Sequence, residues 1–229
     1  MKNKKYELLK RDFIIHKGRK LYRIRAIEDV RDGDELVVCG GVSGGYVEGY
    51  HNLSQEEGCW IYDNAKVYGN ARIEDSAIVC QEAEVFGNAV IKGCAGVDGK
   101  SKVYGNARML EYSYVCDSEI FGNAVISGCA GIKISCKIYD NSAILGGSIY
   151  IENYNCIHGN ATIGSLESSR DRIYIDSNVD ISGNSTIRGD KFEAWNKSNI
   201  SGNVDISGDS YFHSFNISGN SKIVDKILP

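Results

Sequence analysis

An aliphatic residue recurs at every sixth position of this 229-residue chain from Ile61 to Val115. Four residues after each of the first nine, only Ala or Ser occurs, from Ala65 to Ser113. An amphipathic helix would place its apolar residues three and four positions apart, so this strict period excludes it. The pattern predicts a coil of very short parallel strands, each bringing one large and one small side chain to the inside.

A second repeat gives the size of one coil. The dipeptide Gly-Asn or Asp-Asn, followed by Ala or Ser, recurs with Asn spacings of 18, 18, 17 and 18 residues, at Asn70, Asn88, Asn106, Asn123 and Asn141. Three hexads therefore make one turn, and three flat walls meeting at three corners make a triangular prism. Gly and Asn suit the corners because both accept a positive φ. The chain is expected to fold as an all-β parallel β-helix of about nine coils.

The segment Val67-Tyr68-Gly69-Asn70-Ala71-Arg72 and its copies resemble the hexapeptide repeats of left-handed β-helix proteins, the fold of many acyltransferases. A closer resemblance, to YdcK-type proteins described as acyltransferases and to related phage and prophage proteins, rests on a stretch that includes Leu21-Tyr22-Arg23-Ile24-Arg25-Ala26, Gly44-Gly45-Tyr46-Val47-Glu48 and Cys59-Trp60-Ile61-Tyr62-Asp63-Asn64-Ala65. The resemblance implies a left-handed coil. It also implies, as one expectation, an activity that uses acyl-CoA.

Residues 1–59 are expected to form a small N-terminal β cap. Alternating apolar residues predict a hairpin over residues 12–27 with a turn at Lys17-Gly18, followed by a glycine-rich connection over 28–59. Gly40-Gly41 and Gly44-Gly45 indicate tight turns in that connection. The cap should cover the first coil, because an open edge strand would pair with other chains.

The β-helix is expected to occupy residues 60–229, with insertions at 164–172 and 190–199. Tyr150 and Ile157 are expected to continue the inward period ahead of the first insertion, and residues 227–229 to close the far end. Replacing the inward Val85 by Asp would bury an unpaired charge and should cost several kcal/mol. The outward Glu84 on the same strand should be replaceable with little effect.

Charge is distributed unevenly along the chain. Residues 1–31 hold eleven Lys or Arg against four Asp or Glu, a balance of +7 that leaves −11 for the remainder. This predicts an acidic prism with a basic cap, whose cations include Lys17, Arg19, Lys20, Arg23 and Arg25. Such a patch can bind nucleic acid or an acidic partner. Alternatively, the cations are solvated or lie against the protein's own acidic groups.

The residue after each inward aliphatic points outward, and on one wall these residues are Tyr68, Phe86, Tyr104, Phe121 and Tyr139, followed by His158. Two interpretations remain open. The rings stabilise the coil by stacking on one another and on the cap, or they form a flat face that binds a protein or a second copy of the chain. The neighbouring Asn series is explained by side-chain amides that bond from coil to coil.

The resemblance to acyltransferases implies a histidine that deprotonates the acceptor at a subunit interface, with acyl-CoA between neighbouring prisms. His158 is the alternative candidate for that role, with Glu167 and Asp171 in the next loop. The long loop that usually walls such an active site is missing from the early coils, so we expect no catalytic residue and no cofactor. No CxxC pair or Cys/His cluster predicts a metal site, and the eight cysteines are expected to be free thiols in the cytoplasm.

The sequence therefore favours a rigid, non-catalytic binding protein that engages a macromolecule through the aromatic face, the basic cap or both. A phage or prophage accessory protein that inhibits a host defence machine is the specific expectation. The alternatives are a YdcK-like acyltransferase acting as a trimer and a self-assembling structural element, so a dimer or trimer is among the expected states. No apolar run approaches the roughly 20 residues that span a bilayer, so no membrane contact is expected.

Overall fold

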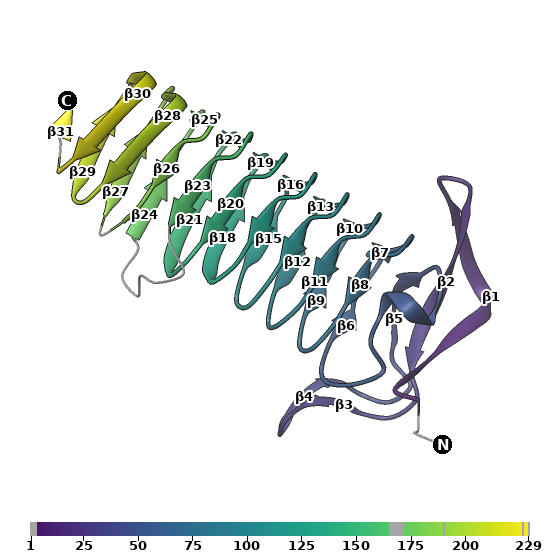
Figure 1. Ribbon diagram of the computed structural model, residues 1–229. Coiled ribbons are helices and arrows are strands. Elements are labelled where there is room, and N and C mark those ends of the chain that lie inside the picture. The colour runs from purple at the N-terminus through teal and green to yellow at the C-terminus, as the bar shows by residue number, and fades with distance from the viewer. Residues whose placement is uncertain (1–3, 165–171, 190, 226, 229) are drawn as a thin grey trace.

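The computed structural model describes residues 4–164, 172–189, 191–225 and 227–228. Its strands wind into a parallel β-solenoid of about nine turns of ~18 residues, preceded by antiparallel strands (Figure 1). The described ranges contain no α-helix and one 3-10 turn, Tyr50–Asn52, and none of their helices is long and apolar enough to cross a membrane. The predicted all-β parallel β-helix is confirmed.

Each turn contributes one strand to each of three walls. Wall 1 contains β7 (Lys66–Val67), β10 (Glu84–Val85), β13 (Lys102–Val103), β16 (Glu119–Ile120), β19 (Lys137–Ile138), β22 (Cys156–Ile157) and β25 (Asp180–Ile181). Wall 2 contains β8 (Arg72–Ile73), β11 (Val90–Ile91), β14 (Arg108–Met109), β17 (Val125–Ile126), β20 (Ala143–Leu145), β23 (Thr162–Gly164) and β26 (Thr186–Ile187). The longer strands β28 (Asn199–Ser207) and β30 (Asn216–Val224) run through both walls.

Wall 3 is a separate ten-stranded sheet. Its strands are β6 (Trp60–Ile61), β9 (Ile78–Val79), β12 (Gly96–Asp98), β15 (Tyr114–Cys116), β18 (Cys129–Lys133), β21 (Ser148–Glu152), β24 (Arg172–Ile175), β27 (Phe192–Trp195), β29 (Ser210–His213) and β31 (Ile227–Leu228).

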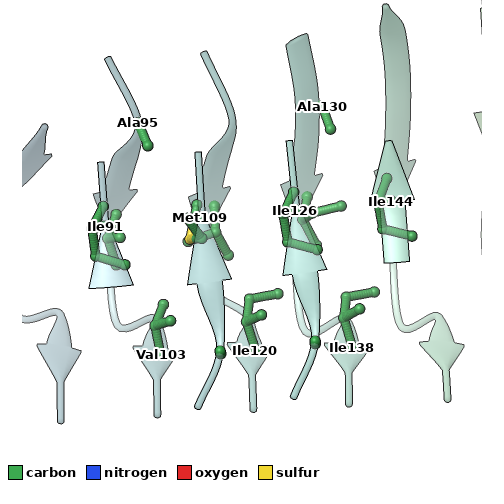
Figure 2. Packing of buried hydrophobic residues seen from close by; sticks show 14 of the residues in the cluster. Ile91, Ala95, Val103, Met109, Ile120, Ile126, Ala130, Ile138 and Ile144 are labelled. Atoms are coloured by element: carbon green, nitrogen blue, oxygen red, sulfur yellow. The ribbon is translucent and has the colours of Figure 1, made fainter. Parts of the chain in front are cut away.

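The core is a dry column inside the three walls. Equivalent aliphatic residues pair in register from coil to coil, as Val67, Val85, Val103 and Ile120 do on wall 1. All ten members of the six-residue series from Ile61 to Val115, and all nine small residues between them, have 0% exposure. Figure 2 shows Ile91, Met109, Ile126 and Ile144 stacked along wall 2 and facing the aliphatic residues of wall 1.

The corner between walls 1 and 2 is built from the Gly-Asn repeat. Gly69, Gly87, Gly105 and Gly122 have φ between 69° and 73°. A Cβ on Gly87 would lie 3.0 Å from the backbone nitrogen and oxygen of Gly105, so the stacked corners leave no room for a side chain. The amides form the expected ladder, in which each Nδ2 donates to the Oδ1 of the next coil at 2.8–3.0 Å, through Asn70, Asn88, Asn106, Asn123, Asn141, Asn160, Asn184, Asn203 and Asn220.

The cap extends wall 1 beyond the first coil. Strands β1 (Tyr6–His16) and β2 (Arg19–Ala26) form the predicted hairpin, which starts six residues earlier than expected, and β2 pairs antiparallel with β5 (Ser43–Val47). Strand β5 then pairs parallel with β7, so the cap covers the first coil as expected. Tyr6, Ile24 and Leu53 close the end of the core with at most 1% exposure.

The connection over 28–59 is more regular than the sequence indicated. It contains a small second hairpin, β3 (Val30–Asp32) and β4 (Glu35–Val38), as well as β5. Gly44 and Gly45 lie inside β5, so the expected turn there is wrong. A Cβ on Gly44 would lie 2.4 Å from the Ile61 carbonyl oxygen, and one on Gly45 2.6 Å from the Ala65 oxygen. Glycine is required because the cap backbone crosses directly over the first coil.

The second half of the solenoid also corrects two expectations. The stretch 190–199 contains β27, which pairs with β24 and β29, so it continues wall 3 and is not an insertion there. Tyr150 points outward with 46% exposure because Ile149 and Ile151 on either side are both buried. Of the insertion at 164–172, residues 165–171 lie outside the described residues.

Strand β31 pairs with β29, but the side chains of residues 227–229, expected to close the far end, lie outside the described part. All eight cysteines are free thiols. Cys136 is buried at a small inward position and Cys94 is exposed at a corner, as predicted, whereas the exposed Cys129, also predicted at a corner, begins strand β18.

Candidate functional site

The aromatic residues of wall 1 form one continuous stack. Consecutive ring centroids in the series Tyr68, Phe86, Tyr104, Phe121, Tyr139 and His158 lie 4.8–5.1 Å apart, with interplanar angles of at most 2°. This spacing equals the distance between neighbouring strands, so the coil repeat itself imposes the stack. We call these six residues the aromatic column. The next coils continue the position with Ser182, Ser201 and Ser218.

A column of alternating charge runs beside the aromatic column. The residue before each inward aliphatic of wall 1 also points outward, and the series reads Lys66, Glu84, Lys102, Glu119 and Lys137 in register. Opposite charges on directly adjacent strands stabilise the sheet, and Lys102 Nζ lies 3.9 Å from Glu119 Oε1. This alternation was not predicted, although it is visible in the sequence when residues one coil apart are compared.

The basic hairpin tip folds over the first two rings. His16 meets the Tyr68 ring edge-on with centroids 5.4 Å apart, and Lys17 Nζ lies 4.7 Å above the Phe86 centroid. Tyr68 is 4% exposed, and it packs with Leu21 and Tyr46 of the cap. The open part of the column therefore begins at Tyr104.

Glu84 holds this hairpin tip in place. Its Oε2 accepts hydrogen bonds from Lys17 Nζ at 2.8 Å and Tyr68 Oη at 2.9 Å, and His16 Nε2 lies 3.1 Å away. Burial alone would raise the pKa of the Glu84 carboxyl, but hydrogen bonds from Lys17, Tyr68 and His16 outweigh it and lower the pKa to about 2. Nothing in the sequence indicated that the hairpin covers this outward position, and with these contacts we now expect replacement of Glu84 to loosen the hairpin tip.

The cations predicted as a basic cap mostly have carboxylate partners. Lys17 pairs with Glu84, Arg19 with Glu48 at 2.9 Å, Arg23 with Asp12 at 3.3 Å, and Arg25 with Glu7. Lys20 instead lies over the rings of Phe13 and Tyr22, 3.9 and 5.1 Å from their centroids. The paired cations thus lie against the protein's own carboxylates.

The contrast between an acidic prism and a basic cap is also wrong. Residues 32–59 contain six acidic residues and no Lys or Arg, which reduces the +7 of residues 1–31 to +1 for the whole cap. Residues 60–229 then carry a net charge of −5, which brings the whole chain to −4. Three of these six acidic residues, Asp32, Asp34 and Glu35, lie on the β3–β4 hairpin.

A hollow of about 510 Å³ opens where the hairpin tip meets the first two corners. Its lining combines the cap with the start of the aromatic column and the Asn ladder, and consists of Lys17, Arg19, Glu48, His51, Tyr68, Gly69, Asn70, Phe86, Gly87 and Asn88. His51 is fixed there, since its Nε2 lies 2.8 Å from the Gly69 carbonyl oxygen. The hollow brings together Glu48 and His51, neither of which was predicted as a site residue.

The structure separates the four histidines. His158 ends the aromatic column, and its Nε2 lies 3.1 Å from Asp180 Oδ1 while its Nδ1 lies 4.0 Å from Asp140 Oδ2. These aspartates come from the neighbouring coils; the expected partners Glu167 and Asp171 lie outside the described residues. His16 is on the hairpin, His51 in the hollow and His213 on wall 3. In the described ranges, no three His, Cys, Asp or Glu side chains are arranged to hold a metal ion.

Wall 3 carries a second set of outward tyrosines, including the neighbours Tyr150 and Tyr174, which are 46% and 36% exposed. The six-residue period did not indicate that these tyrosines point outward, because the aliphatic residues on both sides of each tyrosine point inward.

Comparison of the chain with protein-family models found no match, and comparison with curated proteins found none either.

Proposed function

We propose that this protein is a non-catalytic binding protein whose open aromatic column, Tyr104, Phe121, Tyr139 and His158, contacts a partner protein. The observation that supports this proposal is the position of the hairpin tip, which buries Tyr68 and places Lys17 over Phe86, while the next four rings, half-buried like Phe86, lie at the surface beyond it. Each ring is fixed by its neighbours and by a rigid coil, so binding would cost little side-chain entropy.

The stack favours a protein over a sugar or a single-stranded nucleic acid. Those ligands bind aromatic side chains by stacking on ring faces, and here every internal ring face is covered by the adjacent ring. Ring edges and the Tyr104 hydroxyl face outward, whereas the Tyr139 hydroxyl accepts a hydrogen bond from Cys156 Sγ at 3.6 Å. The alternating Lys and Glu beside them give no excess of positive charge for a polyanion.

The biological setting of the proposal comes from the resemblance of the repeats to left-handed hexapeptide-repeat proteins and to phage-related YdcK-type proteins. In this setting the coil is left-handed, the protein acts in the cytoplasm as a phage or prophage accessory protein, and the partner belongs to a host defence machine.

The test is a comparison of co-purified proteins from the native host. Tyr104→Ser combined with Tyr139→Ser should lose a protein that the parent retains, at an unchanged yield of folded solenoid. The matched control is Tyr150→Ser with Tyr174→Ser, which removes two outward tyrosines from wall 3. Equal recovery with all three proteins would exclude the aromatic column as the binding face.

A YdcK-like acyltransferase is the second candidate, because His158 lies within hydrogen-bond distance of Asp180. A general base oriented by a carboxylate is the arrangement that deprotonation of an acceptor needs. This candidate expects acetyl-CoA to bind and turnover to fall on His158→Ala. The binding-protein proposal expects neither.

A further inference from the structure

The cap exposes more apolar surface than its size would suggest. Among the described residues, six of the twelve exposed large hydrophobic side chains lie within residues 1–59: Phe13, Ile15, Ile27, Leu36, Val42 and Tyr50. Five of them lie on or beside two hairpins, β1–β2 and β3–β4, which we call the basic hairpin and the acidic hairpin. Exposed apolar side chains gathered in this way mark an interaction surface.

The outer side of the basic hairpin combines rings with unpaired cations. Ile14 turns toward Tyr68 and the solenoid, so Phe13 and Ile15 on either side point away from it, with 42% and 67% exposure. Lys10 Nζ lies 4.2 Å from the centroid of Tyr22, which Lys20 also approaches. Within the described ranges, no carboxylate pairs with Lys10 or Lys20, nor with the exposed Arg11, so like charges are crowded on this surface.

The acidic hairpin has the opposite charge, and its carboxylates repel one another. Asp32 and Glu35 are directly opposite across the two strands, and Asp34 lies in the turn between them. Like charges in that relation destabilise a strand pair. Arg31 lies 3.6 Å from the Asp29 carboxylate and donates to the backbone oxygen of Asp34 at 3.1 Å, and no cation of the described chain forms an ion pair with the three carboxylates at the tip. Leu36, 44% exposed, lies beside them.

We propose that the outer side of the basic hairpin binds the acidic hairpin of a second copy of this chain, in a two-fold symmetric dimer. Both hairpins lie at the N-terminal end, with the acidic hairpin projecting sideways and β1 outermost (Figure 1). A two-fold axis beside the caps makes the same contact twice, which closes the assembly. Each contact brings Lys10, Arg11 and Lys20 against the carboxylate tip, and buries Phe13 and Ile15 with Leu36.

A second copy is favoured over nucleic acid because the acidic hairpin would repel a polyanion brought to the same end of the molecule. The surface lies outside the open aromatic column, so this dimer does not depend on the proposed partner binding. The dimer relieves both like-charge clusters at once, which neither hairpin achieves within one chain.

Sedimentation of the full chain over a concentration series tests the dimer. The parent should dimerise at low salt and dissociate at high salt, because exposed charges are screened. Asp34→Lys with Glu35→Lys reverses the acidic hairpin, and Lys10→Glu with Lys20→Glu reverses the basic one. Each double variant alone should be monomeric, and an equal mixture of the two should regain the dimer, since both contacts are then complementary again.

The control is Glu82→Lys on the solenoid, which should leave the dimer intact. A parent that stays monomeric at low salt would overturn the proposal, as would a mixture that fails to recover the dimer while both variants keep the parent's circular dichroism. Binding of a labelled DNA duplex by a monomeric parent, lost only in the Lys10→Glu, Lys20→Glu variant, would assign the surface to nucleic acid instead.

Discussion

Replacing Glu84 by Gln should release the hairpin tip in a pH-dependent way. The carboxyl pKa falls from an ordinary 4.5 to about 2 in the folded protein. At roughly 1.4 kcal/mol per pH unit, this difference corresponds to about 3 kcal/mol at neutral pH. That figure is an upper bound, because 51% of the Lys17 side chain is exposed and water screens its charge. Gln keeps the shape of Glu84 and loses the charge.

The sign of the pH dependence follows from the lowered pKa. Because the folded protein prefers the ionised form, the stabilisation by Glu84 is complete above pH 4.5 and is lost as the pH falls from 4.5 toward 2. The parent and Glu84→Gln should therefore differ most near neutral pH and converge in acid. Hydrogen exchange of the hairpin tip, residues 13–20, is the appropriate assay, since the tip can open while Tyr6, Ile24 and the coils stay packed.

In that assay Glu84→Gln should exchange the hairpin amides faster at pH 7, while the amides of walls 2 and 3 keep their protection. Glu82→Gln, an exposed carboxylate in the same coil, provides the matched control and should behave like the parent. Identical hairpin protection in the parent and Glu84→Gln at pH 7 would refute the assignment of Glu84 as the residue that holds the hairpin.

Four further substitutions test the scaffold and the column. Val85→Asp should lower the free energy of unfolding by several kcal/mol, measured by urea denaturation, because it leaves an unpaired charge at the axis; an unchanged midpoint would contradict a dry core. Gly44→Ala should lower the melting temperature far more than Gly33→Ala, which has open space around it and carries only the strain of φ +58°; equal losses would argue against the close approach of cap and coil. Tyr104→Phe should keep the stack and the melting temperature yet weaken partner recovery, and parent-like recovery would show that the hydroxyl makes no contact with the partner. Phe121→Leu should lower the free energy of unfolding by about 1–3 kcal/mol, because two ring contacts are lost.

The sequence predicted those features that repeat with the coil. Val67 and Val85 are buried, and Tyr104 and Phe121 stack, because one residue type at one position of successive turns fixes both its direction and its neighbours. Strand β27 was not predicted, because the spacing of the residues around it departs from six. Tyr150 was predicted to point inward, but it lies on a longer strand in which the residues directly before and after it both point inward.

The contacts of the cap could not be predicted from the sequence, for a different reason. Lys17 and Glu84 are 67 residues apart, and no period links a hairpin to the wall it covers. The strand over Gly44 and Gly45 was missed because paired glycines indicate turns unless a second backbone is known to pass close by. The packing of the cap on the solenoid therefore determines which outward residues of wall 1 are accessible. These accessible residues form the candidate site.

The length of the open column connects the two proposals. Its four rings span about 15 Å, from the three spacings between Tyr104 and His158. A standard protein interface buries about 800 Å² on each partner, roughly a square 28 Å on a side, so this strip needs neighbouring charged residues to complete a stable contact. A dimer joined through the caps would present two such strips on one rigid body. Two modest contacts to a repeating or symmetric partner then bind far more tightly than either alone, because the second forms at a high effective concentration.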